Sequence, residues 1–336
     1  MKTKLQELAN KKRQLDALKP LPQELQNQLE DWLKVELTYS SNAIEGNTLT
    51  RAETAEAIEK GVRATISGKS LKDQLEAINH ARAVDYIRSL AKKLRGHQFI
   101  SEKHILSIHK FILGGIDDNW AGRYRETEVF IRGANIILPL PHKVPYLMDE
   151  FVQWLEKQQK EHPVKVAALA HLKLVTIHPF VDGNGRTARL MMNLILLLGG
   201  YPVSIIKNED RTDYLDALAI AQTKNNIKPY SNLIENAVER SLNVYLNATQ
   251  KNPTLSPFQE KKGDLLKIGE LAKETNETVP TIRFWTNEGL LKVESHTKSG
   301  YQLYDWSMVD QVKKIRKLQN QRLTIAEIKK ELQILT

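Results

Sequence analysis

One short stretch, residues 178–189, gathers side chains suited to chemistry on a phosphate ester. It reads HPFVDGNGRTAR. At its centre, Gly183, Asn184 and Gly185 come directly before a segment with helical periodicity. Small residues at such a point let successive backbone amides face one spot, and the positive end of the helix adds to the field there. The stretch therefore predicts an anion-binding nest of the kind that holds phosphates.

Charged and titratable side chains flank this nest. Arg186 and Arg189 are three residues apart, so on a helix they project from nearly one face and can grip successive phosphates. Asp182 offers a hard oxygen ligand that suits Mg²⁺, and His178 offers an imidazole that can accept a proton from a hydroxyl. Taken singly, each feature is more often structural: a turn, a solvated helix face, a histidine beside a proline. Their combination favours a site for nucleotide chemistry.

The stretch resembles the signature of the Fic family, His-Pro-Phe-x-Asp/Glu-Gly-Asn-Gly-Arg-x-x-Arg, with every defining position present. The similarity extends over about residues 20–245, since GRYRETEVFIRG, LMMNLILLLGGYP and RTDYLDAL also resemble the family. It implies a mostly α protein whose helical core carries a β-hairpin flap. It also implies a protein adenylyltransferase, which transfers AMP from ATP to a Tyr, Thr or Ser hydroxyl of a target protein, or of itself.

The resemblance assigns roles at the reacting end and at the base of the nucleotide. His178 would be the general base, and Asp182 would hold Mg²⁺ against the α- and β-phosphates of ATP. Tyr214 lies in a matching segment that would line the nucleotide site. Gln222 stands where the family often has an adenine-contacting asparagine, and a glutamine can make similar hydrogen bonds from a longer arm.

The remaining phosphate contacts follow from the same resemblance. Asn184 would support the α-phosphate, Arg186 the inner phosphates and Arg189 the γ-phosphate. Gly183 and Gly185 would complete the cradle through their backbone.

A flap is expected over residues 122–143, where hydrophobic residues alternate and a Gly-Ala-Asn turn follows. The strand holding Glu128, Val129, Phe130 and Ile131 would pair with the backbone of a target protein by strand addition. A hairpin with a purely structural role is the alternative.

A built-in inhibitor is expected near the N-terminus. The run Ser41-Asn-Ala-Ile-Glu45-Gly46 resembles the inhibitory motif Ser/Thr-x-x-x-Glu-Gly/Asn of many Fic proteins. The carboxylate of Glu45 would pair with Arg189 and keep that arginine from a γ-phosphate. Related enzymes with such a glutamate can also remove AMP, so a bifunctional enzyme remains an alternative.

Most of the chain has the periodicity of helices. Thr50-Arg-Ala-Glu53 is a capping box, and Ser70 begins a long amphipathic stretch to about Leu94. Further helices are expected at about residues 101–113, 144–159, 164–177, 187–198, 210–222 and 229–246.

The last part of the chain resembles the DNA-binding domain of MerR-family regulators, with two short helices, a Gly-Tyr wing and two more helices. By this resemblance Thr281, Arg283, Lys298 and Tyr301 would contact DNA, mainly at phosphates. Gln302 replaces an arginine common in such wings. A protein-docking or folding module without DNA contact is the alternative.

These patterns divide the chain into four parts. A helical N-terminal region, residues 1–100, contains the inhibitory segment at about 36–47. The catalytic core spans 101–246. A linker with two prolines, 247–264, precedes a winged helix-turn-helix, 265–336.

Composition narrows the class of protein. The 336 residues carry a formal charge of +9 and contain no cysteine, which excludes disulfides and thiolate catalysis. The N-terminus lacks a signal peptide's apolar core, and no apolar run could span a membrane. We therefore expect a cytoplasmic protein that does not engage a membrane and, by analogy with DNA-binding regulators, forms a homodimer.

Particular residues of the sequence argue against three rival functions. A DNA-binding regulator that uses the Fic core only to sense nucleotide would not need His178. The interpretation as a P-loop enzyme is supported only by Gly68-Lys69-Ser70. The first glycine of the P-loop motif would fall at position 63, which is Arg63. The sequence contains no H-E-x-x-H motif, which argues against a zinc hydrolase.

Overall fold

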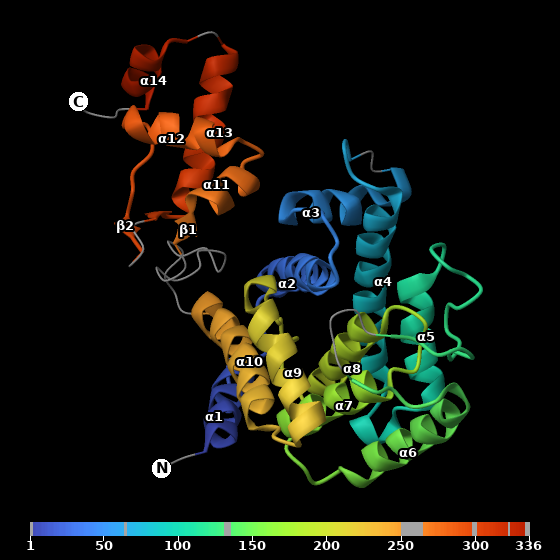
Figure 1. Cartoon of the computed structure of the whole chain (residues 1–336). Coiled ribbons are helices and arrows are strands. Elements are labelled where there is room, and N and C mark those ends of the chain that lie inside the picture. The colour runs from blue at the N-terminus through green and yellow to red at the C-terminus, as the bar shows by residue number, and fades with distance from the viewer. Residues whose placement is uncertain are drawn as a thin grey trace. The chain divides into compact units, whose positions relative to one another are not determined.

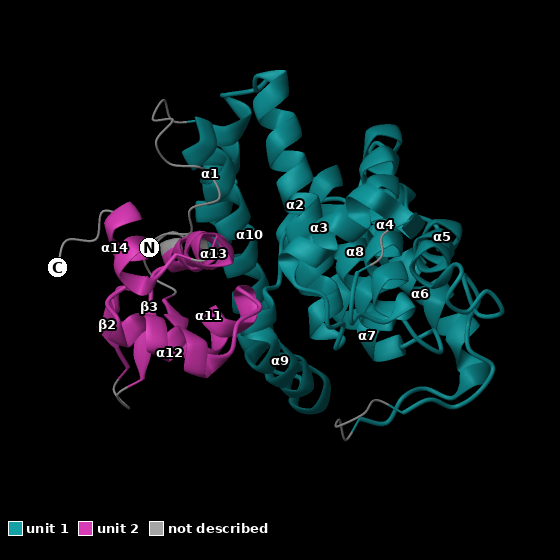
Figure 2. Cartoon of the chain, turned by 90° about the horizontal axis from the view of Figure 1, so that it is seen from above, with its two compact units in different colours: residues 1–257 teal, residues 258–336 magenta. Residues whose placement is uncertain are grey.

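The computed structural model describes residues 3–63, 66–130, 136–249, 265–297, 301–321 and 323–332. The chain forms two compact units, residues 1–257 and 258–336 (Figure 2). Within the described ranges, no helix combines the length and the apolar character that crossing a lipid bilayer requires.

Helices build the first unit (Figure 1). They are α1 (Lys4–Asp16), α2 (Gln23–Ile44), α3 (Arg51–Lys60), α4 (Leu71–Lys93), α5 (Glu102–Leu113), α6 (Val144–Lys157), α7 (Pro163–Ile177), α8 (Asn184–Leu198), α9 (Arg211–Lys224) and α10 (Lys228–Thr249). Short 3₁₀ turns at Gly61–Arg63, His97–Phe99, Pro141–Lys143 and Asn208–Asp210 lie between them.

Local sequence explains where several helices begin. The Thr50 side chain accepts a hydrogen bond from the Glu53 amide, and the Glu53 side chain bonds back, which confirms the capping box. The Ser70 side chain accepts from the Asp73 amide and so caps α4. Each such cap contributes about 1 kcal/mol of helix stability.

Helix α8 lies at the centre of the core, packed against α7, α4 and α5. Its apolar residues Leu190, Met191, Leu194 and Ile195 are completely buried. Burial of each such side chain stabilises the fold by roughly 1.5–3 kcal/mol. The helix that begins at the predicted phosphate nest is therefore held rigidly.

Three predicted boundaries were wrong. Helix α8 begins at Asn184 rather than at about 187, because Gly183 takes a positive φ of 76° and serves as its N-terminal cap. The inhibitory segment is the end of a long helix, since α2 already begins at Gln23. Helix α10 continues to Thr249, into the segment expected to be a linker; residues 250–264 lie outside the described residues.

The flap leaves the first unit between α5 and α6. Residues 128–130 and 136–140 have no helical structure, and the described part of this segment contains no paired strand. The side chains of Phe130 and Ile137 are 90% and 99% exposed. The predicted turn and Ile131 lie outside the described residues.

The second unit contains a three-stranded antiparallel sheet in the order β1–β3–β2. Strand β3 (Gln302–Tyr304) pairs with β1 (Leu266–Lys267) and with β2 (Ser295–His296), as a wing requires. Helices α11 (Ile268–Glu274), α12 (Val279–Asn287), α13 (Ser307–Asn320) and α14 (Ile325–Glu331) complete it. Trp285, Tyr304 and Ile315 belong to its own apolar core.

Candidate active site

The loop between α7 and α8 is shaped by its own side chains. Helix α7 ends at His178, whose φ of 51° is left-handed and turns the chain. Across the loop, the side chain of Asn184 accepts from the Phe180 amide at 2.9 Å and donates to the Phe180 carbonyl at 2.8 Å. Asn184 was expected to support a phosphate; in the structure its side-chain amide closes the loop.

A buried histidine supports this loop from α5. The His109 ring stacks on Phe180 with centroids 3.6 Å apart, and its Nε2 lies 2.9 Å from the Asp182 carbonyl. Its Nδ1 accepts from the Gly122 amide at 3.0 Å, so Nε2 must carry the proton and donate. Burial lowers the pKa of His109 to about 4, which keeps the ring neutral. The sequence offered no spacing that pointed to this residue.

The imidazole of His178 is poised as a base. Its Nδ1 lies 3.2 Å from the Val175 carbonyl, and a carbonyl can only accept, so the proton resides on Nδ1. Burial lowers the pKa of His178, which leaves the ring neutral at pH 7 with a lone pair on Nε2. A neutral imidazole with this tautomer can take a proton from a hydroxyl.

Arg125, which the sequence patterns did not single out, holds the loop between α7 and α8 against the base of the flap. Its guanidinium is buried and donates to three main-chain carbonyls, those of His178, Thr127 and Pro139. Its own amide donates to the Pro179 carbonyl at 2.9 Å. The flap and the loop are therefore joined through one side chain.

The predicted inhibitory pair is present. Arg189 Nη2 lies 2.7 Å from Glu45 Oε1, and Arg189 also donates to the side chain and the carbonyl of Ser41, at 2.9 and 2.8 Å. Burial opposes the charge of Arg189, but Glu45 and Tyr214, both hydrogen-bonded to it, raise its pKa. The arginine is thus charged and fully engaged by the end of α2.

Glu45 lies in the place that an anion would take at the start of α8. A Cβ added to Gly185 would come within 2.2 Å of Glu45 Oε1 and 3.0 Å of Arg189 Nη1. Only a glycine leaves room for this approach. The carboxylate therefore lies against Gly185, in the first turn at the positive end of the helix.

The other arginine of the motif lies between two carboxylates. Arg186 is buried; its Nη1 lies 3.0 Å from Glu76 Oε1 on α4, and its Nη2 lies 3.5 Å from Asp182 Oδ1. Asp182 is half-exposed at 53%. Glu76 was not predicted, because nothing in the spacing along α4 distinguishes it.

Tyr214 and Gln222, both on α9, differ in how far they are exposed to solvent. Tyr214 is buried, and its hydroxyl lies 2.9 Å from His171 Nε2, so it supports Arg189 from within the core. The pKa of His171 is lowered to about 3 by burial. Gln222 is partly exposed, and its side chain donates to Thr176 at 3.0 Å. Only Gln222 therefore lies where a ligand could meet it.

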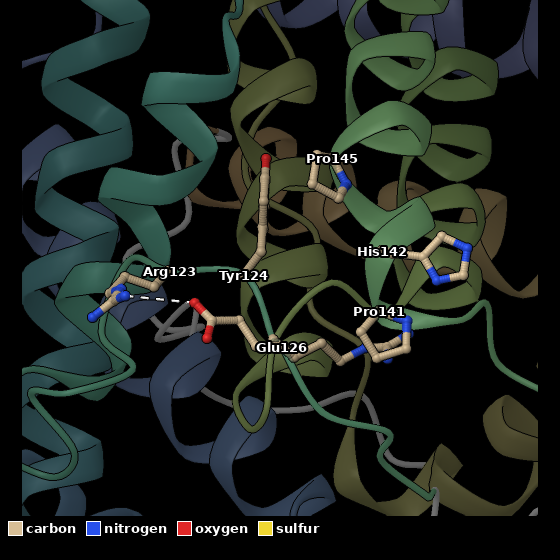
Figure 3. Close-up of a pocket in the computed structure, with 7 residues that line it drawn as sticks. Arg123, Tyr124, Glu126, Pro141, His142 and Pro145 are labelled. Atoms are coloured by element: carbon tan, nitrogen blue, oxygen red, sulfur yellow. Dashed lines mark ion pairs between the residues drawn. The ribbon is translucent and has the colours of Figure 1, made fainter.

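A hollow of about 510 Å³ lies at the base of the flap. Both ends of the flap line it, through residues 123–126 on one side and Pro141, His142 and Pro145 on the other. An ion pair joins Arg123 to Glu126 at 3.6 Å (Figure 3). Figure 3 shows His142 and Pro145 on the other side of the opening. The hollow adjoins the flap residues that bond to the catalytic loop.

Comparisons with known proteins identify the family. The Fic/DOC family model matches residues 99–196. A Fic domain containing signaling protein from Bacteroides thetaiotaomicron is 31% identical, with a TM-score of 0.64, and the match covers 73% of this chain and 97% of that one. The chain belongs to the Fic/DOC family. Fic-1 from C. elegans, residues 134–508, is also 31% identical, with a TM-score of 0.66, over 74% of this chain and 72% of that chain.

Curated Fic relatives carry an enzyme name. The protein adenylyltransferase Fic of Drosophila grimshawi is 40% identical over 234 residues, which is 68% of this chain and 47% of the relative. That of Aedes aegypti is 40% identical over 215 residues, 63% of this chain and 42% of the relative. The chain thus spans about half the length of the curated Fic proteins it matches.

The second unit of this Fic protein matches the MerR HTH family regulatory protein over residues 266–334. On α12, Arg283 is exposed and Thr281 partly exposed, and Tyr301 is 61% exposed beside β3. A shallow polar depression is lined by residues that include Arg283, His296 and Tyr301. Lys298 lies outside the described residues.

Proposed function

We propose that this chain is a protein adenylyltransferase, which transfers AMP from ATP to a hydroxyl side chain of a target protein. One arrangement supports the proposal above the others: a neutral imidazole, His178, and two buried arginines, Arg186 and Arg189, converge on the N-terminus of α8. A helix N-terminus with two guanidiniums suits a polyphosphate, and the imidazole beside it supplies a base.

The proposed reaction uses these groups in one displacement. His178 Nε2 takes the proton of the incoming hydroxyl, whose oxygen attacks the α-phosphorus. The bond from the α-phosphorus to the bridging oxygen of the β-phosphate breaks, and pyrophosphate leaves. Arg186 and Arg189 stabilise the negative charge that gathers on the leaving group.

Asp182 is the residue that would hold Mg²⁺. Its carboxylate is half-exposed and close to Arg186. Mg²⁺ is commonly bound through one or two carboxylates, substrate phosphates and water, so a single such carboxylate beside a phosphate nest fits the ion. When bound, the ion supplies charge neutralisation at the phosphates.

Glu45 is proposed to restrain this activity. Its carboxylate lies against Gly185 and pairs with Arg189, so a γ-phosphate cannot take its place at that arginine. The exposed flap, with Glu128, Val129 and Phe130, is proposed to hold the backbone of the target near His178. The chain itself is a further candidate acceptor of AMP.

Incubation with labelled ATP tests the proposal. We expect Glu45→Gly to transfer more AMP than the unchanged protein, and Glu45→Gly combined with His178→Ala to transfer none. Because hydrogen bonds to a charged group contribute about 1.5–3 kcal/mol, the gain should be roughly 10- to 100-fold. Mass spectrometry of candidate targets and of the chain itself measures a gained AMP.

Two controls make this test specific. Glu45→Gln keeps the size of the side chain and removes its charge, and Glu24→Gln makes the same change in the exposed first turn of α2. We expect activation from the first and none from the second. Equal transfer by the unchanged protein and Glu45→Gly would refute the inhibitory role, and transfer by the His178→Ala variant would refute the general base.

A second function is proposed for the second unit, the binding of double-stranded DNA. The match to the MerR family and the exposed Arg283 on α12 support it. We expect a duplex affinity that falls with salt, and a smaller salt slope for Arg283→Ala. Lys330→Ala on α14 removes the same charge elsewhere in the unit and is the control. No salt-dependent affinity for any duplex would reject this function.

A further inference from the structure

A buried carboxylate on α4 joins the phosphate-binding helix to the end of the inhibitory helix. Glu76 is 7% exposed. Its Oε1 lies 3.0 Å from Arg186 Nη1 on α8, and its Oε2 accepts from the side-chain amide of Asn47 at 2.9 Å. Asn47 follows Glu45 by two residues. One carboxylate therefore contacts both the motif arginine and the segment that positions the inhibitory glutamate.

Asn47 is held firmly in its own right. Its side-chain amide also donates to the Asp73 carbonyl at 3.0 Å, and its side-chain oxygen accepts from the Leu49 amide at 3.0 Å. Its backbone amide donates to the Asn42 carbonyl at 3.0 Å, within α2. The donor that reaches Glu76 is thus fixed, and it fixes the rotamer of the carboxylate.

Arg186 depends on Glu76 for its direction. The contact is an ion pair, since neither Nε nor Nη1 of Arg186 makes a hydrogen bond within the described residues. The guanidinium is planar, so the attraction of Nη1 toward Glu76 also orients Nη2. That second nitrogen lies 3.5 Å from Asp182, at the mouth of the loop. Glu76 is buried where Asp182 is half-exposed, so it is the less screened of the two partners.

We propose that Glu76 is a positioning residue, which aims Arg186 at the β-phosphate of the nucleotide and, through Asn47, couples that aim to the end of the inhibitory helix. The inference rests on the proposed function, in which Arg186 and Arg189 divide the phosphates of ATP between them. Glu76 itself does not touch the nucleotide. Glu76 and Glu45 have opposite effects on their arginines. Glu76 orients Arg186 toward a phosphate, whereas Glu45 pairs with Arg189 and so excludes a phosphate.

The test uses the full chain carrying Glu45→Gly, so that Arg189 is available to nucleotide. Calorimetry measures the Kd values of ATP, ADP and AMP for this chain with and without Glu76→Gln. A glutamine keeps the size of the side chain but removes the charge that pairs with Arg186. We expect the Kd of ATP and of ADP to rise by a similar factor, about tenfold, and that of AMP to stay unchanged.

Three comparisons keep the result specific. Arg189→Ala should weaken ATP and leave ADP unchanged, because only ATP has a γ-phosphate. Asn47→Ala removes the hydrogen bond to Glu76, together with those to Asp73 and Leu49, but leaves the charge of Glu76 in place. It should give a smaller change in the direction of Glu76→Gln, even if the latter folds poorly. Asp85→Asn makes a like change at an exposed site on the same helix, where Asp85 pairs with Lys34 at 2.6 Å, and should alter no nucleotide affinity.

Two outcomes would overturn the proposal. Unchanged affinities in Glu76→Gln and Asn47→Ala would remove the positioning role, and equal losses for ATP, ADP and AMP with a lower melting temperature would make Glu76 a residue of general stability. Failure of the proposed function is separate, since the Glu45→Gly chain would then bind ATP but transfer no AMP.

Discussion

The side chain of Arg125 donates to the main-chain carbonyl of His178 over 2.8 Å. The same guanidinium bonds to the carbonyls of Thr127 and Pro139, on the two arms of the flap. The residue proposed as general base is thus tied to the segment proposed to bring the target.

Replacement of Arg125 should weaken both folding and catalysis. A lysine at this position carries one compact ammonium and cannot reach three carbonyls, so buried acceptors are left without donors. We expect Arg125→Lys to lower the free energy of unfolding by about 1–3 kcal/mol and to lower kcat in the Glu45→Gly background. Urea unfolding and the rate of AMP transfer measure the two effects. Arg82→Lys, at an exposed position on α4, is the matched control. A loss of stability with unchanged kcat would limit Arg125 to a structural role.

The pH profile should report the environment of His178. Burial disfavours the imidazolium, so the pKa of His178 lies below its ordinary value of about 6.5. Activity requires the neutral ring and should be complete above pH 6.5, then fall as pH drops through that lowered pKa. The kcat/KM of the Glu45→Gly chain between pH 4.5 and 8 tests this, with folding checked at each pH. An acid limb centred at or above pH 6.5 would contradict it.

Buried His109 should make the fold sensitive to acid. Burial lowers its pKa to about 4, so below pH 6.5 the imidazole binds a proton in the unfolded chain but stays neutral in the folded chain. The stability due to the neutral ring is therefore full above pH 6.5 and is lost progressively as pH falls toward 4. Between pH 6.5 and 5 the loss should be about 2 kcal/mol.

His109→Gln removes this titration. Whatever its stability at pH 7, its free energy of unfolding should decline less between pH 7 and pH 5, by about the same 2 kcal/mol. Urea unfolding at the two pH values measures the difference. His104→Gln, on the same helix, is the comparison variant. His104 is partly buried, and burial also lowers its pKa. An identical decline in the His109→Gln chain and the parent would refute the assignment.

Chelation should abolish AMP transfer. The proposed metal carboxylate is Asp182, and loss of the ion removes several kcal/mol of charge stabilisation, at least about a hundredfold in rate. In the Glu45→Gly chain, Asp182→Asn should abolish AMP transfer as excess EDTA does. Added Mg²⁺ should restore transfer to the EDTA-treated chain but not to the Asp182→Asn variant. Asp149→Asn, at an exposed position on α6, should keep full activity. Full activity in EDTA would exclude the metal.

The sequence predicts those parts of the site whose interacting residues lie close together along the chain. The loop from His178 to Arg189 is one continuous stretch, and its residue types name its chemistry. Glu45 was predicted through a short motif. Arg125 and His109 were missed because they act on the loop from other elements, and no local spacing encodes such a contact.

The secondary structure shows the same limit. Caps at Thr50 and Ser70 were predicted because the capping bonds are local. The start of α8 was placed too late because glycines suggest a turn, whereas here a single left-handed glycine, Gly183, is enough to begin the helix. In the flap, alternation of apolar residues predicted a hairpin, but the described residues of this segment contain no paired strand, and Phe130 and Ile137 face solvent.

Glu45 is the C-terminal cap of α2, and Gly46 follows it with a φ of 95°. That end is held by hydrogen bonds from Arg211 to the Ile44 carbonyl at 2.8 Å, from the Asn47 amide to the Asn42 carbonyl at 3.0 Å, and from Arg189 to Ser41. Fraying of one terminal turn would carry the carboxylate away from Arg189 while the rest of α2 stays packed, and helix ends open at far lower free energy than cores. Under the proposed restraint by Glu45, a ligand or partner that captured the frayed turn would raise AMP transfer without unfolding the scaffold.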